Sequence, residues 1–186
     1  MSWSICSESV PAEGMTRFRL VSYNMLAESY IGLPYYSYSY SYSSSRCLDW
    51  RNRSKATLTL LKELRSDFLC LLELEHEYFY ITELKTYGYY SVYIQRDGEK
   101  PDWCGIFYKH NVVESLIKNT INYNDLSKSC YDDDDLGYSS YDDGDLGYSC
   151  NGDDDLGRDC VGIMVAFRLR GAPSNHIVIV ANTHIF

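Results

Sequence analysis

One uninterrupted apolar run, Phe-Leu-Cys-Leu-Leu at positions 68–72, ends on the carboxylate of Glu73. A run of this kind without a polar partner predicts a strand that is buried on both faces, and such strands occur mainly in sheets covered by helices. Glu73 is then held at the carboxyl end of the strand, where open α/β sheets bind ligands. A carboxylate beside an apolar strand needs a cation or a cluster of donors. Two interpretations of Glu73 therefore stay open, a metal ligand or the solvent-exposed exit of the strand.

The other regular elements are predicted from the same kind of pattern. Strands are expected at 17–24, 89–95, 104–109, 162–170 and 176–184, and helices at 49–64 and 76–87. In the first helix Asp49 is a possible N-cap, and Leu58 and Leu61 lie at helical spacing. The order strand, helix, strand before residue 75 predicts a covered α/β sheet. The last two strands form a hairpin around residues 171–175, and a sheet ending there would have an exposed edge.

Three segments have the composition of chain outside the folded core. Residues 1–16 are expected to form a flexible leader, and residues 35–45, almost purely Tyr and Ser, a mobile insertion. Residues 131–160 are three copies of an acidic decapeptide with one Leu in each, too little apolar surface to offset the entropy of ordering. We expect a disordered loop there, with a calcium site as the less favoured alternative, because the frame of an EF-hand is absent.

The net charge of −9 belongs to this acidic segment, because residues 131–159 carry eleven Asp and one Arg. The remaining chain is nearly neutral and is not excluded from anionic substrates. The seven cysteines form no CxxC pair, so neither a disulfide framework nor a zinc site is indicated. No run approaches the length of a membrane span, and we expect no membrane partner and a location in the cytoplasm or nucleus.

Six segments, in order, resemble the endonuclease/exonuclease/phosphatase superfamily, and specifically the plant carbon catabolite repressor protein 4 homologues, which are poly(A)-specific exoribonucleases. The matching segments are Val21-Ser-Tyr-Asn-Met-Leu-Ala27, Leu48-Asp-Trp-Arg-Asn-Arg53, Asp67-Phe-Leu-Cys-Leu-Leu-Glu73, Asp102-Trp-Cys-Gly-Ile-Phe-Tyr108, Asp159-Cys-Val-Gly-Ile-Met164 and Asn182-Thr-His184. The resemblance runs from residue 21 to residue 184. It implies that residues 17–186 are the N-terminal part of one domain, an α/β fold that is a partial four-layer sandwich lacking its C-terminal half.

The resemblance also implies the chemistry of the site. It makes Glu73 a ligand of Mg²⁺, places Asn24 in the same polar cluster, and puts His184 at the phosphate-binding site. Asn24 and His184 are then catalytic and substrate-binding residues, and Asp102 is a further substrate-binding residue. The implied reaction is hydrolysis of a 3′-terminal phosphodiester of poly(A) RNA by a metal-activated water. A hard oxygen ligand and neutral or cationic donors suit that reaction. The implied partners are poly(A) RNA and the mRNA deadenylation complex, and DNA is not expected.

This sequence departs from the family pattern at three points. The family has Gln where this chain has Leu72, and Gly where it has Trp103, whose bulk would fill space beside a substrate channel. The Asp-x-Asn pair and the terminal Asp-His pair of the family's second half are absent. We therefore expect a truncated chain that is inactive alone, against two alternatives: a non-catalytic remnant that binds a partner, or a nucleotide phosphatase or phosphodiesterase of the same superfamily.

Overall fold

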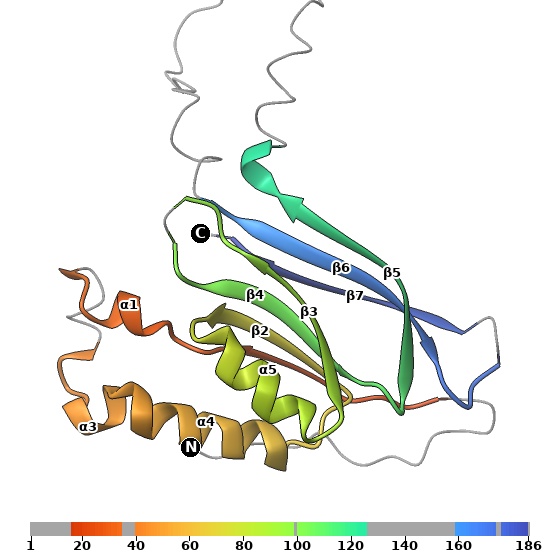
Figure 1. The fold of residues 1–186 in the computed structure, drawn as a ribbon, viewed down its shortest axis with the longest axis horizontal. Helices are drawn as coiled ribbons and strands as arrows, with labels where there is room; N and C mark the ends of the chain where they lie inside the picture. Colours follow the sequence, from red (N-terminus) through yellow and green to blue (C-terminus); the bar gives the residue numbers. More distant parts are fainter. Residues whose placement is uncertain (1–15, 35–39, 99, 126–158, 174–175, 186) are drawn as a thin grey trace, which may run out of the picture.

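Two β-sheets pack face to face, and helices cover the other face of the first sheet (Figure 1). The computed structural model describes residues 16–34, 40–98, 100–125, 159–173 and 176–185. Most of the expected leader, residues 35–39 of the Tyr/Ser segment and residues 126–158 of the acidic segment lie outside the described residues. The expectations about flexibility in those segments therefore stay predictions.

The first sheet has the order β1-β2-β4-β3, in which only the β1–β2 pair is parallel, and the second sheet has the antiparallel order β5-β6-β7. The strands are β1 (Leu20–Asn24), β2 (Phe68–Leu74), β3 (Tyr89–Gln95), β4 (Trp103–Lys109), β5 (Val113–Asn122), β6 (Val161–Leu169) and β7 (Ile177–His184). The helices are α1 (Glu28–Ile31), α3 (Ser45–Leu48), α4 (Trp50–Glu63) and α5 (Glu77–Lys85). The predicted mixed α/β class is confirmed, and each expected strand and helix is present within a few residues of its expected bounds.

Strand β2 lies inside the first sheet and is buried on both faces, as the apolar run predicts. Leu69 and Leu71 pack with the helices, whereas Phe68 and Cys70 pack into the core between the sheets. The helices cover only one of the two faces, because the second sheet covers the other. Because alternate side chains of β2 point to opposite faces, this strand contributes both to the core under the helices and to the core between the sheets.

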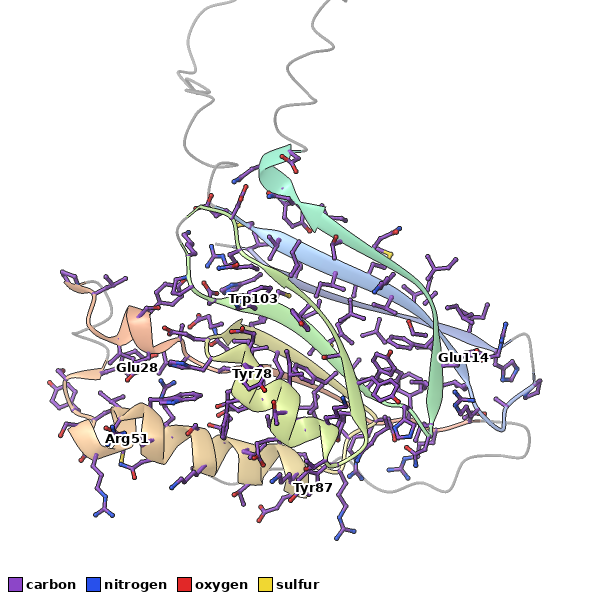
Figure 2. All side chains as sticks on the ribbon, viewed as in Figure 1. Glu28, Arg51, Tyr78, Tyr87, Trp103 and Glu114 are labelled. Atoms are coloured by element: carbon purple, nitrogen blue, oxygen red, sulfur yellow. The ribbon has the colours of Figure 1, made fainter. Side chains whose placement is uncertain are left out.

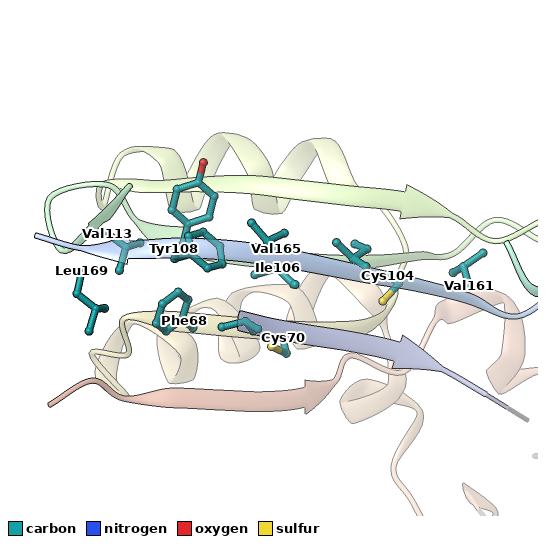
Figure 3. Close-up of a cluster of buried hydrophobic side chains, with 12 residues drawn as sticks. Phe68, Cys70, Cys104, Ile106, Tyr108, Val113, Val161, Val165 and Leu169 are labelled. Carbon is teal, nitrogen blue, oxygen red and sulfur yellow. The ribbon is translucent and has the colours of Figure 1, made fainter. Parts of the chain in front are cut away.

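The core between the sheets is built mainly from β4 and β6, and Phe68 and Cys70 of β2 also line it (Figure 3). The ring of Phe167 on β6 lies 5.0 Å from that of Phe68 and 4.8 Å from that of Tyr108 on β4, measured between centroids. Tilted aromatic contacts of this kind stabilise a core beyond the contribution of the apolar area that they bury. The two sheets are therefore held together by large side chains rather than by small ones.

Strand β5 is the one strand that the sequence pattern did not predict. Its residues Lys118, Asn119 and Thr120 are exposed and polar, so the segment lacks the apolar alternation of a half-buried strand. It pairs with β6 over its length, with a register shift between Ser115 and Ile117. Its conformation is set by this pairing more than by its own sequence.

Helix α4 begins where its sequence signal places it. The side chain of Asp49 accepts hydrogen bonds from the backbone N–H groups of Arg51, at 3.0 Å, and Asn52, at 3.3 Å. Leu58 and Leu61 then point into the core against the sheet. No helix in the described part of the chain is both long and apolar enough to cross a bilayer.

The outer face of the second sheet exposes a row of apolar side chains, which we call the outer apolar face. It comprises Ile117 (65% exposed), Met164 (43%), Ile177 (53%) and Ile179 (64%). Ile117 and Ile179 both pair with Ala166 of β6, so they lie in one cross-strand row. The opposite, inner face of the same sheet is buried.

Candidate functional site

Polar side chains from four segments meet at one end of the two sheets. Asn24 is the last residue of β1, Glu73 lies next to the last residue of β2, and His184 is the last residue of β7. Asp102 immediately precedes β4. The four residues that the sequence singled out are therefore brought together, although their chemical roles stay predictions.

Glu73 reaches this position through an irregularity in β2. Leu71 pairs with Gly105 and Leu74 pairs with Trp103, so two residues of β2 lie opposite one of β4, and the register shifts between them. Glu73 has a left-handed backbone, with φ of 51°. A β-bulge of this kind redirects a side chain, and here it turns the carboxylate toward the end of the sheet.

Glu73 is 4% exposed, and its carboxylate accepts two hydrogen bonds. Asn24 donates from Nδ2 to Oε1 at 2.6 Å, and the backbone N–H of Ala27 donates to Oε2 at 3.1 Å. The other end of the Asn24 amide, Oδ1, accepts from the backbone N–H of Leu26 at 2.8 Å. One amide thus holds both the carboxylate and the turn that follows β1.

Arg53 fixes this turn from behind. Its Nη1 donates to the backbone oxygen of Met25 at 2.9 Å and to that of Leu26. Leu26 has a positive φ of 58°, a conformation that costs energy for a residue other than glycine. Arg53 of α4 therefore stabilises the backbone that supplies the Ala27 N–H to Glu73.

His184 lies between two carboxylates. Its Nε2 is 3.7 Å from Oε1 of Glu73, and its Nδ1 is 3.6 Å from Oδ2 of Asp102. Its exposed fraction is only 3%. The ring therefore connects the carboxylate of β2 with the carboxylate that precedes β4.

Asp102 is fully buried, and Tyr30 and Arg96 surround it. The Tyr30 hydroxyl donates to Oδ1 of Asp102, and Nη1 of Arg96 lies 3.9 Å from Oδ2. Burial raises the pKa of the Asp102 carboxyl, but His184, Tyr30 and Arg96 together outweigh it and hold that pKa below its ordinary value. The direction favours an ionised Asp102 at neutral pH.

Asn182 connects the two sheets beneath the site. Its Nδ2 donates to the backbone oxygens of Leu71, at 3.1 Å, and Gly105, at 2.9 Å. These are the paired residues where the regular β2–β4 ladder stops at the bulge. The buried amide therefore binds two carbonyls that border the irregular part of the ladder.

Comparison with known proteins decides the family. No family model matches the chain. Carbon catabolite repressor protein 4 homolog 4 of Arabidopsis thaliana is 43% identical over 181 residues, which is 91% of this chain and 42% of that protein. The crystal structure of ANGEL2, a 2′,3′-cyclic phosphatase, covers 91% of this chain and 41% of its own with a TM-score of 0.68 and 26% identity. The chain belongs to the endonuclease/exonuclease/phosphatase superfamily, among the carbon catabolite repressor protein 4 homologues.

Further relatives agree with this family. The CCR4-Not complex 3′-5′-exoribonuclease subunit Ccr4 of Debaryomyces hansenii is 30% identical over 59% of this chain and 14% of that protein. The human Nocturnin catalytic domain shares the fold, with a TM-score of 0.59 at 17% identity over 91% of this chain and 49% of that one. The chain spans less than half the length of the Arabidopsis relative and of the ANGEL2 structure.

Leu72 and Trp103, the two residues expected to depart from the family pattern, lie on opposite faces of the first sheet. Leu72 packs against the core between the sheets. Trp103, labelled in Figure 2, packs on the helix side. Its ring meets that of Tyr93 edge to face, with 5.4 Å between the ring centroids. The expectation that Trp103 narrows a substrate channel stays a prediction.

The side chains at this end of the sheets offer few ligands for Mg²⁺. Within the described ranges, no group of three or more His, Cys, Asp or Glu side chains is arranged to hold a metal ion. Magnesium needs fewer protein ligands, since it keeps several waters and often binds through one or two carboxylates and a substrate phosphate. The single carboxylate of Glu73, beside the amide of Asn24, fits a site of that kind.

Sequence reasoning missed Tyr30, Arg96 and Arg53 as members of the site. Arg53 lies within a segment of family resemblance, which was a usable signal. Tyr30 and Arg96 come from a short helix and from a turn after β3, and no periodic pattern marks them. Only the folded chain brings these two residues to Asp102.

Proposed function

We propose that this chain carries part of the active site of a Mg²⁺-dependent 3′-5′ exoribonuclease of the mRNA deadenylase type, acting on poly(A). The observation that carries the proposal is the meeting of Asn24, Glu73 and His184 at one end of the sheets. The family membership and the name of the Debaryomyces relative support it.

Each proposed role follows from the chemistry of its side chain. Glu73 would hold Mg²⁺, which when bound supplies charge stabilisation at the phosphate and a more acidic water. Asn24, which is exposed, would orient the carboxylate and donate to a phosphate oxygen. His184 would place a ring nitrogen toward the same phosphate, where negative charge grows during hydrolysis.

For Asp102, the burial of its side chain favours a role other than the expected direct contact with substrate. Its exposed fraction is 0%, and His184 stands between it and Glu73. A direct contact with substrate would require the side chain to leave Tyr30 and His184. We therefore propose that Asp102 acts on substrate only through His184.

Metal binding is tested apart from catalysis. Mn²⁺, a paramagnetic substitute for Mg²⁺, is titrated into the ¹⁵N-labelled chain, and amide signals near the ion should broaden. Broadening is expected to centre on Asn24, Glu73 and Ala27 and to disappear in Glu73→Gln. Glu63→Gln, an exposed change at the end of α4, is the matched control and should leave the pattern intact. Broadening that persists in Glu73→Gln would reject Glu73 as the ligand.

Catalysis is tested in two forms of the protein. The chain of 186 residues with Mg²⁺ and labelled oligoadenylate is expected to leave the RNA length unchanged, because one carboxylate cannot also provide a general base. A chimera that joins it to the remaining C-terminal part of the Arabidopsis relative should shorten the RNA, and Glu73→Gln in the chimera should abolish shortening. A folded chimera that acts on oligoadenylate neither with a 3′ hydroxyl end nor with a 2′,3′-cyclic phosphate end would favour the non-catalytic alternative.

A second candidate function is hydrolysis of a ribose 2′,3′-cyclic phosphate. It is favoured by the likeness to the structure of ANGEL2, a 2′,3′-cyclic phosphatase. Both reactions break a phosphate ester at the 3′ oxygen of a ribose, so the same three residues suit either. The chimera should be given oligoadenylate ending in a 3′ hydroxyl and, separately, in a 2′,3′-cyclic phosphate; the preferred end decides between the two functions.

The partners and location are also part of the proposal. The Debaryomyces relative is by name a subunit of the CCR4-Not complex. We propose that this chain meets RNA and a deadenylation complex of that kind in the cytoplasm or nucleus. Recovery of complex subunits with the tagged chain from its own cells, after ribonuclease treatment, is the expected result, and imaging of the tagged chain tests the location.

A further inference from the structure

The end of the first sheet that lies away from the candidate site carries a pocket rich in arginine. This open pocket of about 220 Å³ is lined by Arg17, Phe18, Arg19, Arg65 and Asp67. Its three guanidinium groups outnumber its one carboxylate, so it has a net positive charge. It lies where β1 and β2 begin, whereas Asn24 and Glu73 lie where these parallel strands end.

The carboxylate of this arginine pocket has a structural role. Oδ2 of Asp67 accepts from the backbone N–H of Arg19 at 2.7 Å, and Nη1 of Arg19 donates to the backbone oxygen of Leu64 at 2.8 Å. These bonds hold the start of β1 beside the segment that leads into β2. Arg17 and Arg65 are exposed at the pocket. Guanidinium groups bind phosphate oxygens through paired N–H donors, so the pocket suits a phosphate group.

A second pocket lies next to the arginine pocket. This open pocket of about 310 Å³ is lined by Ile81, Lys85, Tyr89, Tyr90, Ser91 and Tyr108. The two pockets are neighbours because Lys109, which pairs with Tyr89, donates its backbone N–H to the backbone oxygen of Asp67 at 2.9 Å. The second pocket, which we call the tyrosine pocket, opens at β3, the edge strand of the first sheet.

Aromatic rings and cations are interleaved around the tyrosine pocket. Tyr90 is 51% exposed, and its ring stacks on that of His110 with 4.9 Å between the centroids. Nζ of Lys109 lies 4.2 Å from the centroid of the Tyr89 ring, and Lys85 is exposed at the end of α5. Surfaces of this composition bind single-stranded nucleic acid, because bases stack on the rings while phosphates meet the cations.

We propose that the arginine pocket and the tyrosine pocket together bind single-stranded RNA, at a surface separate from the candidate active site. The arginine pocket takes a phosphate of the backbone, and the exposed ring of Tyr90 takes one base. An acidic peptide would also meet the arginines, but it would make no use of an exposed ring beside them. The ring therefore favours RNA over such a peptide. Only the choice of RNA over single-stranded DNA rests on the proposed function.

Binding is measured with fluorescein-labelled oligoadenylate by fluorescence anisotropy, on the whole chain of 186 residues without divalent metal. Affinity should fall as salt rises, because phosphate contacts release counterions. Arg17→Gln with Arg65→Gln should weaken binding at least about fivefold at low salt and reduce the slope of log Kd against log salt by about one to two. The control, Arg51→Gln with Lys55→Gln, removes the same charge from α4 and should alter neither value (Figure 2 labels Arg51).

Tyr90→Ala tests the stacking of a base. It should weaken binding at least about fivefold and leave the salt slope unchanged, because no charge is lost. Tyr78→Ala removes a tyrosine that is 77% exposed at the other end of α5, and this matched control should bind as the unmodified chain does. Normal binding of RNA by Tyr90→Ala, together with displacement of the RNA by an acidic peptide, would assign the surface to a protein partner and overturn the proposal.

Two further results would overturn the proposal: no binding by the unmodified chain at low salt, or equal losses in the arginine double variant and its control. If the arginine double variant does not fold, Lys85→Gln is compared with Lys55→Gln, and only the first should weaken binding. Glu73→Gln should bind RNA normally, whereas loss of binding there would place the RNA at the candidate site. An inactive chimera that still binds RNA through Arg17 and Tyr90 would reject the proposed function and keep this surface.

Discussion

The backbone of Glu73 adopts an energetically unfavourable conformation at the point where its carboxylate enters the site. A left-handed conformation is unfavourable for a side chain with a Cβ atom by about 1–2 kcal/mol. Glu73 keeps this conformation, with φ of 51°, while its carboxylate accepts from Asn24 and Ala27. The two hydrogen bonds thus accompany local strain, a combination that is frequent at functional sites.

This strain predicts an unusual order of stability among variants at position 73. Glu73→Ala and Glu73→Gly both remove the acceptor for Asn24 and Ala27, but only glycine relieves the backbone. Glu73→Gly should be the more stable of the two by about 1 kcal/mol, measured by urea unfolding. At Lys55, in the middle of α4, the order should reverse, because alanine favours a helix by about 1 kcal/mol. A Glu73→Ala variant as stable as Glu73→Gly would contradict the account.

The buried cysteines predict a second residue-level result. Burial raises the pKa of the Cys70 thiol to about 11 and is the main cause that raises the pKa of Cys104 to about 12, whereas Cys47 is exposed. At pH 8 iodoacetamide should modify Cys47 at least about tenfold faster than Cys70 or Cys104, because only thiolates react. The rates are read peptide by peptide with mass spectrometry. Equal rates would mean that the core opens readily.

The same pKa shifts give a stability that depends on pH. Because the folded state holds the thiol proton more tightly than the unfolded state, these groups favour folding below the ordinary pKa of 9.0. That contribution is lost as the pH rises from 9.0 toward about 11. The free energy of unfolding should therefore fall over this interval, and replacing Cys70 with Ala should reduce the fall.

At the scale of elements, α4 does two things for the site. Its apolar side chains cover the first sheet, and its Arg53 holds the turn after β1. The start of the helix is set by one side chain, that of Asp49. An isolated helix of this length would be marginal in water, so its cap and its packing together determine whether it forms.

Removal of the cap should therefore be felt by the whole helix. Asp49→Ala leaves the N–H groups of Arg51 and Asn52 without their acceptor and should lower the free energy of unfolding by about 1 kcal/mol. Glu63→Ala, at the carboxyl end of α4, is the control and should be neutral or slightly stabilising, since a negative charge there opposes the helix dipole. Urea unfolding followed by circular dichroism provides both values, and an equal loss in the two variants would be incompatible with a capping role.

At the scale of the whole molecule, the outer apolar face leaves several large apolar side chains exposed on one sheet. Contiguous exposed apolar side chains promote dye binding and association. The double variant Ile117→Lys and Ile179→Lys should reduce the fluorescence of bound 1-anilinonaphthalene-8-sulfonate and the tendency to associate in sedimentation. Its stability should change by less than about 0.5 kcal/mol, because both side chains are mostly exposed.

A matched control is Tyr42→Lys, which removes a single exposed aromatic residue (93% exposed) from another region. It should alter neither measurement. If the double variant binds as much dye as the unmodified chain, the outer apolar face is not the source of the binding. If it unfolds readily, the face is covered in solution.

The parts of the fold that the sequence predicted are those with a local cause. The apolar run of β2, the cap and leucine spacing of α4 and the alternation of β7 each identify an element without reference to the rest of the chain. Asn24 and Glu73 meet because the parallel strands β1 and β2 end at the same edge, whereas Asp102 and His184 were indicated only by the family resemblance. Strand β5 and the bulge at Glu73 were not predicted, because both depend on pairing with a distant segment.

The hydrogen bond of Asn182 to Leu71 also affects the order in which contacts form during folding. It binds the carbonyl of Leu71, a residue 111 positions earlier in the chain, next to the bulge that turns Glu73 toward the site. Contacts between such distant residues form slowly, because a long segment must first be closed into a loop. The helices and the first sheet can therefore assemble early, while the carboxylate acquires its final environment only when β7 arrives. In a chain emerging from the ribosome, the contact between Asn182 and Leu71 could form only after β7 has emerged.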